Sequence, residues 1–177
     1  MDAAIPLSVL NELFDYHWWA RDRQLAACAA LTEEQFLRPL GGSFASIRDT
    51  LVHLVAVEWL WLERWRGAAP KALLAPRDFP TLDAVAERWS AVELEMRSYL
   101  AGLTGEILAR PMTCVSTRGN TWTFPLWRML FHLINHQSYH RGQITTLLRQ
   151  LGVEPAKVDF LDAPASYSRE VGNVREM

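Results

Sequence analysis

The sequence predicts an all-α protein, a four-helix bundle with a small β-hairpin before its last long helix. Three observations lead to this prediction. Four long segments repeat apolar side chains at helical spacing. A proline-punctuated linker, residues 70–80, separates the second segment from the third, and a β-branched-rich stretch precedes the fourth. The 177 residues contain no internal repeat or domain boundary, so we expect a single domain spanning residues 1–177.

The first long helix is predicted over residues 6–30, with Pro6 in its first turn. Its apolar side chains recur at helical spacing: Leu7, Leu10, Phe14, Trp18 and Leu25. Residues 32–35, Thr-Glu-Glu-Gln, have the pattern of a capping box. This pattern predicts a short helical turn that ends before Pro39.

The second long helix is predicted to begin at the capping-box candidate in residues 46–49 and to end at Gly67. Between residues 51 and 62 only His53 and Glu58 are not apolar. A helix without a polar face is covered on two sides. The bundle core is expected on one side, and a second subunit of a homodimer is the candidate for the other.

The third long helix is predicted to begin at Thr81 as its N-cap and to end near Gly102. The apolar period then changes, because residues 112–117 and 121–124 are short, β-branched-rich runs. The Arg-Gly-Asn sequence of residues 118–120 lies between them. These runs are therefore predicted to form a β-hairpin.

The fourth long helix is predicted over residues 125–152, with Pro125 in its first turn and Gly152 at its end. The tail beyond Pro155 has a mixed apolar pattern. We expect it to pack as a short segment over one end of the bundle and then to fray.

Composition narrows the class of protein. The net charge of -2 and the scattered arginines give no basic stripe for nucleic acid. No signal peptide and no apolar run of 18 residues is visible, so we expect a cytoplasmic protein without a membrane segment. The two cysteines form no CxxC motif, which fits a reduced compartment. The eight tryptophans are interpreted either as core fillers or as the lining of an aromatic pocket.

Three of the five histidines lie on the fourth predicted helix, four residues apart: His132, His136 and His140. On a helix that turns about 100° per residue, this spacing places them on one face, within the inward stripe. A pair of histidines at i and i+4 can bind one metal ion. His132 with His136 and His136 with His140 satisfy this spacing equally.

A third ligand has to come from another helix, and His53 is the candidate. Three neutral imidazoles leave a coordination position open, which is typical of catalytic rather than structural sites. Zinc, nickel, copper and ferrous iron all suit such ligands. In the alternative interpretation, the histidines are buried and hydrogen-bonded to carbonyls or hydroxyls.

Three other polar residues allow two interpretations each. Gln143, about 20° from His136 on the helical wheel, either supports a metal ligand or a substrate, or is a polar residue at the bundle end. Arg21, on the apolar stripe of the first helix, either binds an anionic substrate group or extends to solvent. Glu58 lies too far around its helix to share an ion with His53, so a salt bridge or a water contact is expected.

Three segments resemble motifs of the DinB-like (DinB/YfiT) family. Residues 135–143, Asn-His-Gln-Ser-Tyr-His-Arg-Gly-Gln, are similar to its Asn-His-x-x-x-His-Arg-Gly-Gln signature. Residues 49–54, Asp-Thr-Leu-Val-His-Leu, resemble its helix-two motif. Residues 16–20, Tyr-His-Trp-Trp-Ala, resemble its Tyr-Asn-x-Trp-Ala-Asn segment, from which the chain departs at His17 and Arg21.

The resemblance implies an up-down-down-up bundle, commonly a homodimer, with a divalent metal ion that is often nickel or zinc. Matched by position, the ligands are His53, His136 and His140, which leaves His132 as a neighbour. If the first helix borders the pocket, His17 and Arg21 would give this chain a different substrate preference.

The resemblance also suggests a reaction. Some members resemble thiol S-transferases or isomerases that use a low-molecular-weight thiol, and others are described as metal-dependent hydrolases. We therefore expect a metal-dependent S-transferase that acts on a small-molecule substrate. The alternatives are a metal-dependent hydrolase and a non-enzymatic stress protein that binds a metal or a hydrophobic ligand. In the latter, His132 or His17 would be a fourth ligand that closes the coordination shell.

Overall fold

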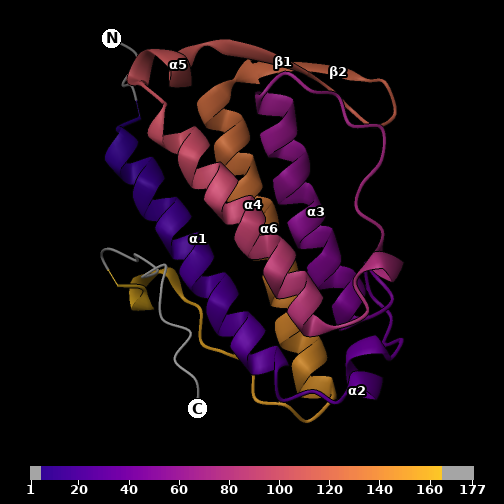
Figure 1. The fold of residues 1–177 in the computed structure, drawn as a ribbon. Coiled ribbons are helices and arrows are strands. Elements are labelled where there is room, and N and C mark those ends of the chain that lie inside the picture. The colour runs from indigo at the N-terminus through magenta and orange to yellow at the C-terminus, as the bar shows by residue number, and fades with distance from the viewer. Residues whose placement is uncertain (1–4, 165–177) are drawn as a thin grey trace.

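The computed structural model describes residues 5–164. Its long helices are α1 (Leu7–Cys28), α3 (Ile47–Trp65), α4 (Leu82–Ala101) and α6 (Leu126–Gln150) (Figure 1). The shorter elements are α2 (Glu33–Leu37), η1 (Pro76–Asp78), α5 (Gly105–Ala109), η2 (Phe160–Asp162) and the strands β1 (Pro111–Val115) and β2 (Thr121–Pro125). The predicted fold, a helical bundle with a small antiparallel hairpin before the last long helix, is confirmed.

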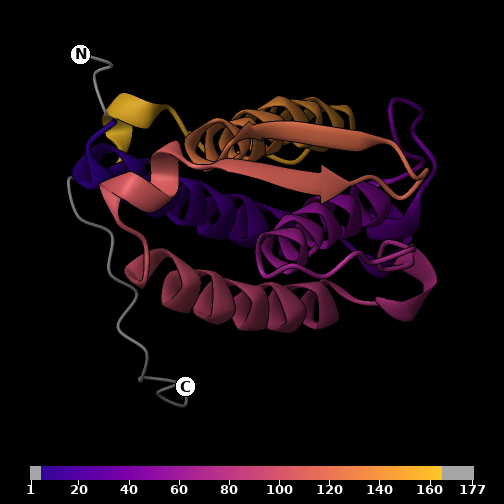
Figure 2. The ribbon, with the colours of Figure 1, turned by 90° about the horizontal axis from the view of Figure 1, so that it is seen from above.

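The four long helices follow an up-down-down-up order. In Figure 1, α1 and α6 run in one direction, while α3 and α4 run in the other. The segment 66–81 connects α3 to α4 by returning along the bundle, which makes it the crossover. Seen from above, α4 and α6 lie on opposite sides of the bundle (Figure 2). Helix α3 therefore packs against both α4 and α6, and the hairpin covers the end of the bundle where α6 begins.

Side-chain caps explain where two of the helices begin. Thr32 and Gln35 form a complete capping box: Thr32 Oγ1 accepts from the Gln35 N–H at 3.2 Å, and Gln35 Oε1 accepts from the Thr32 N–H at 2.9 Å. At α3 the Ser46 hydroxyl accepts from the Asp49 N–H at 3.1 Å. The Asp49 carboxylate accepts instead from Arg48, at 2.8 Å. Ser46 therefore caps α3 without the reciprocal half of the box.

Helix α3 is covered on two sides, as its apolar sequence predicts, but the cover comes from the chain itself. Leu51, Val55 and Leu62 are fully buried within one copy of the chain. Helices α4 and α6 flank α3, and α2 and β1 contact it as well. The apolar sequence of α3 is thus explained without a second subunit, and the homodimer stays a prediction of the family resemblance. None of the described helices is both long and apolar enough to cross a membrane.

The tail packs along α1, and the prediction that it covers one end of the bundle is wrong (Figure 1). The Tyr16 hydroxyl donates to the Val158 carbonyl at 3.0 Å, and Arg23 Nε donates to the Lys157 carbonyl at 2.9 Å. The ring of Phe160 packs edge-on against Tyr16, with 5.0 Å between centroids. These contacts hold the tail against the side of α1. The predicted fraying concerns the last residues of the chain, which lie outside the described residues.

Candidate metal centre

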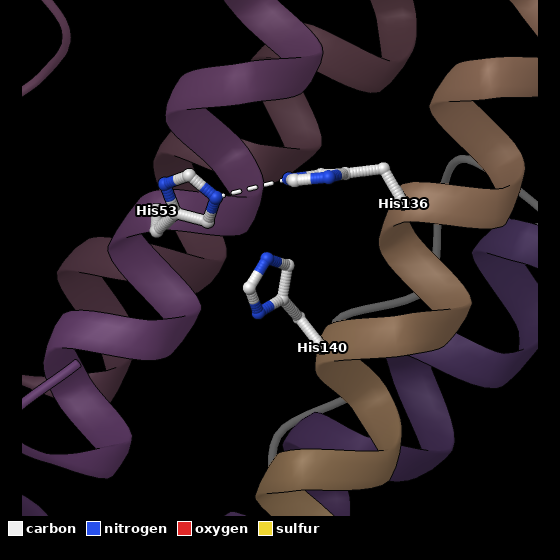
Figure 3. A group of neighbouring side chains, drawn as sticks. All are labelled: His53, His136 and His140. Carbon is white, nitrogen blue, oxygen red and sulfur yellow. Dashed lines mark hydrogen bonds between the residues drawn. The ribbon is translucent and has the colours of Figure 1, made fainter. Parts of the chain in front are cut away.

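Three histidines from two helices meet between α3 and α6. His53 comes from α3, and His136 and His140 come from successive turns of α6 (Figure 3). One ring nitrogen from each lies within 4.8 Å of the others. His140 is buried, and the other two are half-buried. Such a group can hold one metal ion.

The spacing of the nitrogens fits a shared ion. His53 Nε2 lies 3.0 Å from His136 Nε2. Two nitrogens bound to one ion at about 2.0–2.1 Å lie roughly 3 Å apart. The His140 ring stands at 74° to that of His53 and at 71° to that of His136, so the three rings converge without stacking. The donor set therefore fits a divalent transition metal.

A hydrogen bond determines which nitrogen of His140 faces the cluster. Gln143 Nε2 donates to the Ser43 hydroxyl at 2.8 Å. Gln143 Oε1 then accepts from Nδ1–H of His140, also at 2.8 Å. The lone pair of His140 is consequently on Nε2, the nitrogen available to an ion. The structure thus brings Gln143 to the cluster.

Two of the three histidines, His53 and His136, are neutral at ordinary pH. Burial, followed by the neighbouring His140 and His136, lowers the pKa of His53 to about 4. Burial, followed by His140 and His132, lowers the pKa of His136 to about 4. Phe44 contributes to this burial, because its ring lies 4.2 Å from that of His53 and 5.4 Å from that of His140. Unprotonated imidazoles are the form that binds metal.

His132 lies outside the cluster, on the exposed edge of α6. Its ring contacts Trp61 edge-on at 5.5 Å and lies 6.0 Å from the ring of His136. The buried face of α6 is centred instead on residues such as Leu133 and Gln137. The expectation that all three histidines of α6 point inward is therefore corrected: the stripe runs along the edge of the buried face, and the pair at the cluster is His136 with His140.

His17 and Arg21 also lie apart from the cluster, inside the bundle. His17 Nε2 donates to Glu58 at 3.0 Å, and its Nδ1 accepts from Arg141 at 2.9 Å. Arg21 pairs with Glu93 at 2.5 Å and is 1% exposed, so it neither extends to solvent nor lines the cluster. Both side chains bind buried partners inside the bundle, and therefore neither reaches the metal centre. The carboxylate of Glu58, for which the sequence predicts a salt bridge or a water contact, accepts a hydrogen bond from His17, and burial lowers the pKa of that imidazole.

Two residues that hold the cluster together, Gln137 and Phe44, are not among the predicted site residues. Gln137 Nε2 donates to the Leu54 carbonyl at 2.9 Å, which joins α6 to α3 beside His136 and His53. Phe44 lies in the loop before α3 and packs on two of the histidines. Gln137 lies on the apolar stripe of its helix, and a polar residue at such a position predicts a buried hydrogen bond. A loop phenylalanine has no periodicity that would mark it.

Two cavities flank the cluster along the seam between α3 and α6. One, of about 510 Å³, lies on the side of His140 and is lined by the loop 40–44, by Thr50 and by Gln143 among others. The other, of about 340 Å³, lies on the side of His136 and is lined by Trp61 and His132 among others. The three histidines themselves line neither cavity, but residues in contact with them do: Phe44 and Gln143 in the first cavity, and His132 in the second.

Known proteins resemble this chain over most of its length. The sequence model described as the DinB family matches residues 7–171. The chain is 27% identical over 152 residues to YizA of Bacillus subtilis (strain 168), a protein described as uncharacterized, covering 86% of this chain and 94% of YizA. It is 26% identical over 154 residues to the protein DinB of the same organism, covering 84% of this chain and 90% of DinB.

A solved structure shares the fold. The crystal structure of a DinB-like protein from Bacillus cereus matches with a TM-score of 0.63 and 19% sequence identity. The match covers 82% of this chain and 94% of that chain. At this identity, the likeness bears on the fold alone.

Proposed function

The chain belongs to the DinB family, and we propose that it is a metal-dependent member whose divalent ion is held by His53, His136 and His140. The observation that carries the proposal is the approach of three imidazole nitrogens, on two helices, to within 4.8 Å of one another. Nickel and zinc are the proposed ions, because imidazole suits both. Three protein ligands leave a position open for an exogenous molecule, as in catalytic sites.

For the reaction, we propose the transfer of a low-molecular-weight thiol to a small electrophilic molecule. A bound divalent ion lowers the pKa of a thiol at the open position, so that the thiolate forms near neutral pH. The cavity of about 510 Å³ beside His140 suits a polar thiol, because the Ser43 and Thr50 hydroxyls and the Gln143 amide line it. Gln143 and Ser43 keep His140 oriented while the thiol binds.

The low pKa of a thiol is the reason to place thiol transfer ahead of hydrolysis. Among residues 5–164, no carboxylate joins the three histidines closely enough to be a ligand. In many hydrolases a carboxylate or a histidine removes a proton from the attacking water, and a bound metal ion can also lower the pKa of that water to about 7. A thiol has a far lower pKa than water, so that it ionises beside a metal ion without such a base.

The test is a coupled assay with and without the ion. Protein loaded with zinc or nickel is incubated with a cysteine-based thiol and a chloronitrobenzene electrophile, and thioether formation is followed by absorbance. We expect turnover that stops on treatment with a chelator and returns with the ion. Turnover of ester or amide substrates without any thiol would contradict the transferase in favour of a hydrolase. Metal binding without turnover on any of these substrates would favour a binding protein.

A further inference from the structure

An aromatic cavity lies between the hairpin and the seam of α3 and α6. Its volume is about 340 Å³, which is enough for a small aromatic molecule. Its lining comes from α3, β2 and α6: Trp61, Trp122, Phe124, Arg128, Met129 and His132. No acidic side chain is among these residues. The lining therefore combines aromatic rings with positive charge.

The cavity exists because the inner face of the hairpin is incompletely covered. Side chains alternate along a strand, so that Cys114, its cross-strand partner Trp122, and Phe124 face the bundle. Cys114 is buried and contacts Met129 of α6. Trp122 and Phe124 are each still 38% exposed. Two large aromatic residues on the packed face of a hairpin stay this exposed because they border open space.

Two arginines, Arg128 in the lining of this cavity and Arg64 against two of its indole rings, have no acidic partner within residues 5–164. Arg64 is 6% exposed, and its Cζ lies 5.1 Å from the Trp61 ring and 5.7 Å from the Trp122 ring. Its Nε has no hydrogen-bond partner. The Cζ of Arg128 lies 4.7 Å from the Phe124 ring. Buried cations are ordinarily paired, so an unpaired guanidinium against two indoles favours an anionic ligand.

The cavity also adjoins the metal centre. His132 lines it and lies 6.0 Å, ring to ring, from His136. His132 also contacts Trp61, which is another residue of the cavity lining. A molecule in the cavity would therefore have one end beside His132, the neighbour of the proposed ligand His136.

We propose that this cavity is the acceptor subsite and that it binds an aromatic carboxylate. The ring packs against Trp61, Trp122 and Phe124, and the carboxylate is bound by Arg128 with the charge of Arg64 nearby. The opposite end of the molecule lies beside His132, on the side of the cavity nearest the metal centre. The assignment as an acceptor rests on the proposed thiol transfer, whereas binding of the carboxylate does not.

Calorimetric titration of the metal-loaded chain with 2-naphthoate tests the proposal. Arg128→Gln and Trp122→Leu are expected to weaken binding by about 10-fold or more, because each removes one of the two recognition elements. The matched controls are Arg149→Gln, an exposed arginine on the same helix, and Val115→Ala, on the outer face of the hairpin. Both controls should bind like the unchanged chain, and circular dichroism confirms the fold of each variant.

Two further ligands separate the contribution of the aromatic ring to binding from that of the carboxylate. Neutral 2-naphthylmethanol and non-aromatic cyclohexanecarboxylate should each bind at least about 10-fold more weakly than 2-naphthoate. Equal affinity of all three ligands, or equal affinity of Arg128→Gln and the unchanged chain, would overturn the proposal. Self-association that Trp122→Leu abolishes would assign the cavity to a second copy of the chain instead. Binding of 2-naphthoate by His136→Ala should persist, which keeps this test independent of the metal.

Discussion

At the scale of single residues, the proposed centre depends on which nitrogen of His140 carries its proton. The Gln143 carbonyl accepts a hydrogen bond from Nδ1–H, and the Gln143 amide group donates to Ser43. Groups that orient metal-bound histidines in this way tune the affinity for the ion. Sequence spacing placed Gln143 near His136, but its partner is His140, one turn of the helix before it.

Replacing Gln143 with leucine should weaken metal binding by about 10–100-fold, because His140 then loses the acceptor that fixes its proton. Gln143→Glu keeps an acceptor and should lie closer to the unchanged chain. Gln150→Leu, an exposed position on the same helix, is the control. Competition between each variant and a chromophoric zinc chelator measures the affinity. Unaltered affinity in Gln143→Leu would show that this hydrogen bond does not support the centre.

At the scale of elements, the sequence predicted the four long helices and the hairpin, because their apolar periods and caps are local signals. The spacing of the histidines could not choose between two pairs on α6. That choice depends on where α3 crosses α6, and His53 meets α6 beside His136 and His140. The family resemblance selected the same three residues, since its motifs preserve the positions at this crossing.

The elements that the sequence missed are held by few, non-periodic contacts. Helix α5 has five residues and begins at Thr104, whose hydroxyl accepts from the Ile107 N–H at 3.2 Å. The tail is fixed against α1 by bonds from Tyr16 and Arg23 to its carbonyls. The Ser43 contact joins residues 100 positions apart. These hydrogen bonds form between segments that only the packed fold brings together, so no local sequence pattern predicts them.

At the scale of the whole molecule, the buried carboxylate of Glu58 joins all four long helices. It accepts hydrogen bonds from two helices besides its own: His17 Nε2 at 3.0 Å, Trp18 Nε1 at 3.2 Å and Trp89 Nε1 at 2.5 Å. His17 continues the network to Arg141 of α6. Because Arg141 directly follows His140, this network also supports the helix that carries two of the proposed ligands.

Glu58→Gln should therefore lower the free energy of unfolding by about 1–3 kcal/mol, because it removes the charged acceptor of three buried N–H donors. Glu63→Gln is the matched control, one turn further along α3, where the carboxylate is partly exposed and 3.6 Å from Arg66. That substitution should cost less than about 1 kcal/mol. Urea denaturation measures both. A loss in Glu58→Gln no larger than in the control would refute the role of this network.

The same network makes a prediction about pH. Burial would raise the pKa of Glu58, but His17, the Trp89 N–H and Arg21 together hold it below its ordinary value of 4.5. The stability that Glu58 contributes is thus present above pH 4.5 and is lost as the pH falls through its lowered pKa. The difference in stability between the unchanged chain and Glu58→Gln should be constant near neutral pH and shrink in acid. A difference that grows in acid would contradict this assignment.

The metal content of three purified forms tests the central claim most directly. The unchanged chain, His136→Ala and His132→Ala are incubated with nickel or zinc, separated from free ion by gel filtration and analysed for metal. His132 is the matched control, since it is a histidine on the same helix one turn before His136 and lies outside the cluster. We predict about one divalent ion per chain in the unchanged form and in His132→Ala, and none in His136→Ala. A folded, unchanged chain that binds no ion, or equal loss in both variants, would contradict the assignment of the centre to His53, His136 and His140.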